Sequence, residues 1–241
     1  METELGPQKA VIVRSESTGQ ISNWVVFLHG DSPFGDPSYQ YRIARNISQM
    51  TGGSAMAILR PGYRDACGDQ SGGERGLTYG DNYTTEGVAA LAEVISLIRK
   101  NENPVQITLM GHSGGAALTA LLAADFPDLI DQSILVACPC DLPAWRQNMQ
   151  ALTGDSVWTE PMPGRSPLDC VDKVAAGKRI LLFVGADDVV APPSLSEVYH
   201  QAARDKGMEV EIDIIPNADH ESILKSELLR RILRTAGLIQ E

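Results

Sequence analysis

The sequence has few of the features that mark membrane-spanning or nucleic-acid-binding proteins. Its 241 residues carry a net charge of -11, and only 5% of them are aromatic. An acidic chain supplies no basic stripe to neutralise phosphates, so we expect neither nucleic acid nor a membrane as a partner. No apolar run approaches the length of a membrane span, and no basic segment followed by an apolar run stands at the N-terminus. The sequence therefore predicts a cytoplasmic protein with a small-molecule substrate, and it leaves open whether the chain forms a homo-oligomer.

Cysteine and histidine are also scarce. The cysteines are Cys67, Cys138, Cys140 and Cys170, and four histidines are spread along the chain. So few cysteines make no disulfide framework, and Cys138 and Cys140, separated by one proline, are expected to be too close for an easy bridge. The histidines are not placed at metal-ligand spacing. We therefore expect reduced thiols and neither a metal nor an organic cofactor.

Short apolar runs rich in Val, Ile and Leu alternate with longer segments of helical period. This alternation predicts a mostly parallel sheet with helices on both faces. The predicted strands are 9–14, 24–28, 55–59, 105–110, 133–137, 180–184 and 210–215, with 20–22 as an eighth candidate. The predicted helices are 39–50, 84–100, 115–125, 194–206 and 221–235. The length suits one sizeable core, so we expect a single α/β domain over residues 1–241.

Two long stretches, 60–82 and 141–169, lack a strong period. Loops of this length in a compact domain are usually functional, and both follow predicted strands, where ligands bind in open parallel sheets. Segment 141–165 holds Trp145, Trp158 and several prolines. Two interpretations of this segment stay open: a small lid insert that lines a substrate pocket, or a segment packed against the body of the domain.

The strongest local pattern is Gly111-His112-Ser113-Gly114-Gly115, between the predicted strand 105–110 and the predicted helix 115–125. A G-x-S-x-G turn in this context is typical of a nucleophile elbow, which presents a serine on a strained turn. Small residues at its two ends let strand and helix approach closely. A glycine-rich turn without catalytic function has the same local pattern, so the assignment of Ser113 as nucleophile depends on a base and an acid elsewhere in the chain.

A candidate base follows the serine in the chain. His220 comes after the predicted strand 210–215 and a short polar loop, whereas His200 falls within a helical pattern and His112 belongs to the elbow itself. A nucleophilic serine on a parallel sheet takes its base from a later turn of this kind. We therefore predict His220 as the general base.

Three carboxylates compete as the acid that orients the histidine. Asp187 and Asp188 both follow the predicted strand 180–184, and Asp141 follows the earlier strand 133–137. The residues alone leave all three open.

The order of these motifs resembles the α/β-hydrolase family of serine hydrolases, and the resemblance extends over about residues 11–232. It implies an α/β-hydrolase fold with a mostly parallel sheet of about eight strands. Gly185, Asp188 and Pro192 match the family's pattern around the acid, so the resemblance favours Asp188. Within the family, the chain is similar to the dienelactone-hydrolase and prolyl-oligopeptidase branches through Ser166-Pro167-Leu168 and Arg60-Pro61-Gly62-Tyr63.

His29-Gly30-Asp31-Ser32 resembles the family's H-G-x loop. The resemblance implies an oxyanion hole made by the backbone amides of Asp31 and Gly114. A carboxylate pointing at an oxyanion is unfavourable, so we expect the Asp31 side chain to turn outward or to cap a turn.

The resemblance implies a carboxylesterase-like serine hydrolase that works through an acyl-enzyme intermediate. Ser113 attacks the carbonyl carbon, His220 takes its proton and Asp188 holds the histidine. Three alternatives share these residues: an acyltransferase, a small-substrate peptidase and a non-catalytic binding protein of the same fold. Haloalkane dehalogenases and epoxide hydrolases carry an aspartate at the elbow, and Ser113 argues against both.

Specificity is the part that the sequence determines least. Trp145 and Trp158 in segment 141–165, and Tyr63 in the other long loop, are the candidates for binding the substrate. Arginines near Tyr63 are candidates for binding a substrate carboxylate, with simple solvation as the alternative: Arg60, Arg64 and Arg75.

Overall fold

The computed structural model describes residues 1–14, 23–32, 35–76 and 82–240. Within these residues seven strands form the central sheet, in the order β3-β5-β4-β6-β7-β8-β9. Strand β3 is antiparallel to β5, and the other neighbours run parallel. The bounds are β3 Ala10–Val13, β4 Asn23–Leu28, β5 Ser54–Ile58, β6 Gln106–His112, β7 Gln132–Val136, β8 Arg179–Gly185 and β9 Glu209–Ile215.

Every strand predicted without reservation is present. The expected sheet had about eight strands, and the described sheet has seven. The eighth candidate, 20–22, lies outside the described residues. Two further short strands, β1 Glu2–Thr3 and β2 Gly6–Pro7, form a separate antiparallel hairpin.

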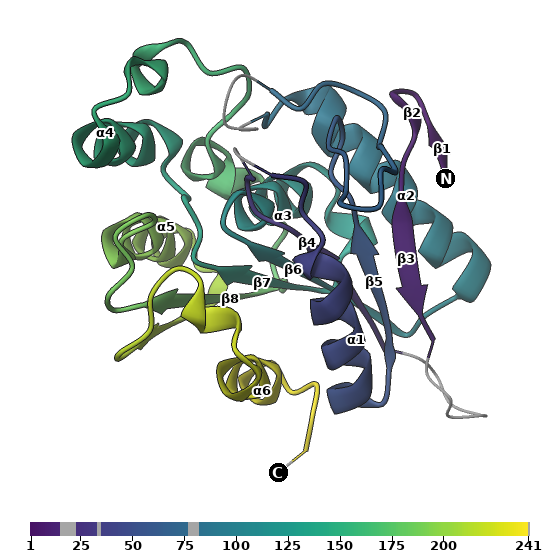
Figure 1. The fold of residues 1–241 in the computed structure, drawn as a ribbon. Coiled ribbons are helices and arrows are strands. Elements are labelled where there is room, and N and C mark those ends of the chain that lie inside the picture. Colours follow the sequence, from purple (N-terminus) through teal and green to yellow (C-terminus); the bar gives the residue numbers. More distant parts are fainter. Residues whose placement is uncertain (15–22, 33–34, 77–81, 241) are drawn as a thin grey trace.

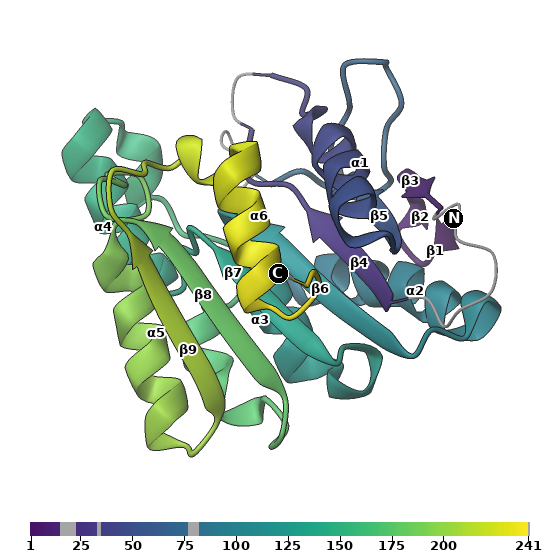
Figure 2. The same cartoon turned by 90° about the horizontal axis from the view of Figure 1, so that it is seen from below.

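Helices cover both faces of the sheet (Figures 1 and 2). One face carries α1 Tyr39–Thr51 and α6 Ser226–Thr235, and the other carries α2 Thr85–Glu102, α3 Gly114–Asp125 and α5 Pro193–Asp205. Strand pleating divides the core accordingly: Trp24 and Val26 of β4 pack on the side of α2 and α3, while Val25 and Phe27 pack on the side of α1. None of the helices in the described part of the chain is long and apolar enough to cross a membrane.

Segment 141–165 is largely helical, which the weak apolar period did not predict. It contains α4 Leu142–Thr153 and a 3₁₀ helix, Ser156–Thr159. Asp141 caps α4, because its Oδ1 accepts from the amide of Ala144 at 3.1 Å, and Gly154 ends the helix with a φ of 72°. Only Leu142, Trp145 and Arg146 of α4 are buried. In Figure 1, α4 stands apart from the two helical layers that flank the sheet.

The expectation of reduced thiols is wrong for one cysteine pair. Cys138 and Cys140 form a disulfide, and their Cα atoms are 5.1 Å apart, within the range that a disulfide spans. The backbone angles of Pro139, the residue between the two cysteines, set this distance and bring them within reach of each other. Both are buried, whereas Cys67 and Cys170 are free thiols.

Candidate active site

Ser113 lies on a strained turn between β6 and α3. Its φ of 53° and ψ of −124° are values that residues other than glycine seldom adopt. The turn is held on both sides, because the amide of Ser113 donates to the carbonyl of Val136 and its carbonyl accepts from Ala116, each at 2.8 Å. A Cβ at Gly115 would lie 2.3 Å from the carbonyl oxygen of Leu28, so glycine is required where α3 begins this close to the sheet.

His220 and Asp188 meet beyond the ends of β9 and β8. Nδ1 of His220 donates to Oδ2 of Asp188 at 2.8 Å. A carboxylate only accepts, so Nδ1 holds the ring proton and Nε2 keeps a lone pair in the neutral imidazole. The other oxygen, Oδ1, accepts from the amides of Val190 and Ala191 at 2.9 and 2.8 Å, and the Asp188 side chain is 0% exposed. The carboxylate is therefore fixed in place within the turn.

The structure separates the three carboxylates that the sequence left in competition. Asp187 is exposed. Asp141 is engaged as the N-cap of α4. Only Asp188, among these three, makes a hydrogen bond with His220.

The loop 29–31 lies against the elbow. A Cβ at Gly30 would approach Cβ of Ser113 to 2.9 Å, so this loop passes directly beside the serine. His29 is fully buried, its Nε2 accepts from the amide of Arg60 at 3.0 Å and its Nδ1 donates to the carbonyl of Gly30 at 2.7 Å. Burial and the neighbouring Arg60 lower the pKa of His29 well below its usual range, so the ring stays neutral. Gly114 begins α3, and its amide has no intrahelical acceptor.

The Asp31 side chain does not turn outward, which was the first of the two orientations expected for it. Its Oδ1 accepts from Nη1 of Arg60 at 2.7 Å, and its Oδ2 accepts from the hydroxyl of Tyr83 at 2.6 Å. A Cβ at Gly114 would lie 2.4 Å from Oδ1, so the carboxylate faces the elbow. The Arg60 side chain is 2% exposed and supplies the compensating charge. Arg60, a candidate for binding a substrate carboxylate, is thus engaged with a carboxylate of the protein.

Ser113, His220 and Asp31 line one cavity of about 390 Å³. The opposite wall comes from α4 and the 3₁₀ helix after it, and includes Trp145 and Trp158. The two indole rings meet edge to face, with centroids 5.1 Å apart. The structure thus brings both predicted tryptophans to the serine. Met149, in the same segment, lines the cavity too. Sequence reasoning did not identify several other lining residues, among them Tyr39 and His112.

Tyr63, the third candidate for binding substrate, does not line this cavity. Its ring is 1% exposed and packs edge to face on His29, with centroids 4.8 Å apart. The guanidinium groups of Arg60 and Arg75 lie over the same ring, 5.1 and 5.0 Å from its centroid. Burial raises the pKa of Tyr63 to about 12. Tyr63 therefore packs against Arg60 and the loop 29–31 without reaching the cavity.

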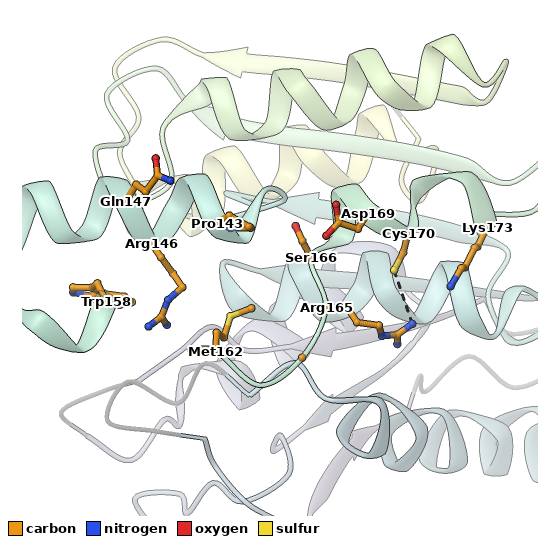
Figure 3. A pocket seen from close by; sticks show the side chains of 11 residues that line it. Pro143, Arg146, Gln147, Trp158, Met162, Arg165, Ser166, Asp169, Cys170 and Lys173 are labelled. Carbon is orange, nitrogen blue, oxygen red and sulfur yellow. Dashed lines mark hydrogen bonds between the residues drawn. The ribbon is translucent and has the colours of Figure 1, made fainter. Parts of the chain in front are cut away.

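A second cavity of about 620 Å³ lies on the other side of Trp158 (Figure 3). Figure 3 shows Trp158 at one end, Lys173 at the other and Met162 between them. Its arginines are engaged: Arg165 pairs with Asp125, and Arg146 donates to the carbonyls of Val157 and Glu160. Ser113 and His220 are absent from its lining, so this larger cavity does not contain the candidate nucleophile and base.

Within residues 1–14, 23–32, 35–76 and 82–240, no cluster of three or more His, Cys, Asp or Glu side chains is arranged to hold a metal ion.

Comparisons with solved structures agree on the fold. Over 96% of this chain and 94% of the other, the structure superposes on Est1E from Butyrivibrio proteoclasticus, solved with ferulic acid, with a TM-score of 0.72 and 16% identity. The esterase of Pyrobaculum calidifontis gives a TM-score of 0.71 at 14% identity, over 98% of this chain and 81% of the other. The Pyrococcus horikoshii acylaminoacyl peptidase gives 0.69 at 18% identity, over 94% of this chain but only 37% of that longer protein.

Sequence comparisons identify the family. No curated protein sequence matches the chain. A family model does, namely that of the prolyl oligopeptidase family, over residues 76–236. That range contains the elbow, the turn after β8 and the turn after β9. The chain therefore belongs to the prolyl oligopeptidase family and is a serine hydrolase of the α/β-hydrolase fold.

Proposed function

We propose that the protein is an esterase that hydrolyses carboxylic esters through Ser113, His220 and Asp188. One arrangement carries the proposal: a serine on a strained turn lines the same cavity as a histidine whose Nδ1 is bound to a buried carboxylate at 2.8 Å. Asp188 fixes the tautomer of the histidine, so Nε2 is the nitrogen that accepts a proton.

In the proposed mechanism, His220 takes the proton of the Ser113 hydroxyl while the oxygen attacks the ester carbonyl. The tetrahedral intermediate collapses, and the same proton passes from His220 to the departing alcohol. Water then attacks the acyl-enzyme, losing a proton to His220, and as the bond between the acyl group and Ser113 breaks, His220 returns that proton to the serine oxygen and the acid is released. Asp188 stays ionised and stabilises the imidazolium through both steps.

The proposed oxyanion hole uses the amides of Asp31 and Gly114. Its support is the position of both residues next to Ser113 and the dipole of α3, whose positive end lies at Gly114. Each donor of this kind is worth about 3 to 4 kcal/mol of transition-state stabilisation. The Asp31 carboxylate opposes an oxyanion nearby, and Arg60 offsets it.

The cavity favours an apolar acyl group without negative charge. Trp145, Met149 and Trp158 provide an apolar wall. Asp155 and Glu221 also line the cavity, whereas no Lys or Arg appears among its described lining residues. A substrate carboxylate would meet like charge here, so we propose that segment 141–165 acts as a lid insert that admits uncharged acyl chains and aromatic acyl groups.

A small-substrate peptidase is the second candidate function. Membership of the prolyl oligopeptidase family and the likeness to an acylaminoacyl peptidase favour it. The triad chemistry is the same for esters and amides, so the choice depends on the leaving group.

The test combines a probe with a substrate panel. A fluorophosphonate should label the wild-type protein and not Ser113→Ala, which keeps its fold by circular dichroism. The panel contains p-nitrophenyl acetate and butyrate, the anionic mono-p-nitrophenyl glutarate, methyl ferulate and aminoacyl naphthylamides. The esterase proposal predicts fast turnover of butyrate and slow turnover of glutarate. Faster turnover of the naphthylamides than of every ester would support the peptidase instead, and labelling of Ser113→Ala would overturn both.

A further inference from the structure

The hydroxyl of Tyr39 sits between two functional segments. Tyr39 is the first residue of α1, and its oxygen accepts from the amide of Gly30 at 2.6 Å. The same hydroxyl lies 2.9 Å from Nδ1 of His112, and the two rings meet edge to face. Tyr39 therefore links the loop 29–31 to the elbow.

The side chain of His112 continues the connection on its other side. Its Nε2 lies 2.9 Å from the backbone carbonyl of His220, and the two imidazole centroids are 5.0 Å apart. His112 is 3% exposed. Burial, together with the nearby His220, lowers its pKa to about 3, so the ring is neutral at any pH where the protein would work.

The two ends of this chain of hydrogen bonds determine the direction of every proton in it. The Gly30 amide can only donate, so the hydroxyl of Tyr39 accepts from it and gives its own proton to His112 Nδ1. The His220 carbonyl can only accept, so His112 donates from Nε2. A neutral imidazole protonated on Nε2 alone satisfies both neighbours. No other tautomer does.

Each segment joined in this way carries part of the proposed chemistry. Gly30 directly precedes Asp31, whose amide is a proposed oxyanion donor. His112 directly precedes Ser113, and the third segment is the base His220 itself. We propose that Tyr39 and His112 are positioning residues that hold the oxyanion donor, the nucleophile and the base in register. The inference rests on the proposed function of these three groups.

The energetic reason is the small tolerance of the reaction for misplacement. A shift of about 1 Å in a catalytic group can cost a factor of about 100 in rate. Without the hydroxyl of Tyr39, the amide of Gly30 loses its acceptor and Nδ1 of His112 loses its donor. The loop 29–31 and the elbow are then free to move apart. The oxyanion donor and Ser113 lose their relative positions, although every group that touches the reacting atoms is still present.

The principal test compares Tyr39→Phe with Tyr41→Phe. Tyr41 lies on the same helix, and its hydroxyl donates to Oδ2 of Asp65 at 2.7 Å, away from the cavity lining. Each variant loses one hydroxyl: Tyr39→Phe loses the bonds to the Gly30 amide and to His112, and Tyr41→Phe loses the bond to Asp65. We expect Tyr39→Phe to lower kcat for p-nitrophenyl butyrate by about 10- to 100-fold with KM nearly unchanged. Tyr41→Phe should keep kcat within about twofold, while urea unfolding shows a comparable loss of stability in both.

A second pair of variants tests His112 and covers the case in which Tyr39→Phe fails to fold. The amide of Gln at position 112 reaches the place of Nε2 and donates to the His220 carbonyl, whereas Phe keeps the ring and donates nothing. His112→Gln should therefore retain clearly more of the wild-type kcat than His112→Phe. A rate of fluorophosphonate labelling that follows the same order would place the defect at Ser113 rather than in substrate binding.

The outcomes separate this inference from the proposed function. If the wild-type protein is not labelled and hydrolyses nothing in the panel, the proposed function fails, and the inference fails with it. If the wild type is active but Tyr39→Phe matches Tyr41→Phe in kcat, the positioning role is overturned while the esterase stands. Equal activity of His112→Gln and His112→Phe would overturn it too, as would a change in KM alone.

Discussion

The two walls of the active-site cavity are built in different ways. One wall, called the catalytic wall because it carries the proposed nucleophile and base, consists of Asp31, Ser113 and His220, and Asp188 lies behind it, bound to His220. All four residues lie on turns that follow parallel strands. Hydrogen bonds of 2.6 to 2.9 Å hold most of its side chains or backbone groups. The α4 wall consists of Trp145, Met149 and Trp158, on α4 and the 3₁₀ helix after it. It is joined to the turn after β8 by a bond of 2.9 Å from Asn148 to the carbonyl of Val189.

This difference separates chemistry from specificity. Changes in the catalytic wall should abolish turnover of every substrate, because its groups act on the reacting atoms. Changes in the α4 wall should alter which substrates are turned over, because its side chains meet the acyl group and leave the catalytic turns in place. The predictions below test this division, from the largest expected effect to the smallest.

The largest effect is expected from Asp188→Asn. An amide at this position can donate to Nδ1 and stabilise the wrong tautomer of His220, so kcat should fall by about 10⁴-fold for all esters. Asp187→Asn and Asp141→Asn are matched controls, and the second keeps a good helix cap. Steady-state kinetics on the three variants, with circular dichroism for the fold, decides the matter. If Asp141→Asn loses most of its kcat while Asp188→Asn keeps a kcat close to that of the wild type, the assignment of Asp188 as the acid is wrong.

A second large effect is expected from Arg60→Met. This change leaves the buried carboxylate of Asp31 without its cation, and breaking such a pair costs about 3 to 5 kcal/mol of unfolding free energy. The uncompensated charge beside the elbow should also slow acyl-enzyme formation. Asp31→Asn combined with Arg60→Met should regain part of both losses, as measured by urea unfolding and by kcat.

A partly exposed ion pair serves as the control for this prediction. Arg165→Met breaks the ion pair with Asp125. The Arg165 side chain is 28% exposed and that of Asp125 is 18% exposed, so the change should lower the unfolding free energy by only about 1 kcal/mol. A loss in Arg60→Met no greater than that would mean that Arg60 does not offset the charge of Asp31.

The same division explains what the sequence predicts and what it does not. Ser113, His220 and their strands follow from local patterns, because a buried parallel strand and the turn after it are encoded within a few residues. Partners distant in the chain do not follow in this way. Asp31 and Arg60 are 29 residues apart in the chain, and no local sequence pattern predicts their ion pair.

The α4 wall was harder to predict for a different reason. Its helix buries only Leu142, Trp145 and Arg146, whereas α3 is buried along nearly its whole length and directly follows the elbow. The cap at Asp141 and the glycine at 154 were the usable signals. The Cys138–Cys140 disulfide depends on the backbone conformation at Pro139, which the residue types do not specify.

A smaller, selective effect is expected from Trp145→Phe. The shorter ring enlarges the acyl side of the cavity, so the ratio of kcat/KM for longer acyl esters to that for acetate should rise by about tenfold. Turnover of p-nitrophenyl acetate should stay within about twofold of wild type. The control is Trp24→Phe, the same truncation in buried β4 outside the cavity lining, which should lower stability without changing the chain-length profile. Equal losses for every ester in Trp145→Phe would contradict the separation of the two walls.

The effect with the least bearing on turnover concerns the pH dependence of stability, through His112. Its pKa is lowered to about 3 in the folded protein, chiefly by burial, against about 6.5 in an unfolded chain. Between these values the unfolded state binds a proton that the native state does not. The contribution of His112 is therefore fully present above pH 6.5 and is lost as the pH falls, by up to about 1.4 kcal/mol per pH unit.

His112→Gln removes this titration while keeping a donor toward the His220 carbonyl. Its unfolding free energy should be lower than that of the wild type at pH 7, and it should then fall less steeply toward pH 4.5. Urea unfolding at pH 7, 5.5 and 4.5 measures both curves, and their difference cancels the carboxylates that titrate in the two proteins alike. The difference in unfolding free energy between the two proteins should therefore shrink as the pH falls, with a slope that corresponds to about one proton. Parallel curves would mean that His112 takes up its proton equally in both states, which a ring 3% exposed between two hydrogen-bonded neighbours should not do.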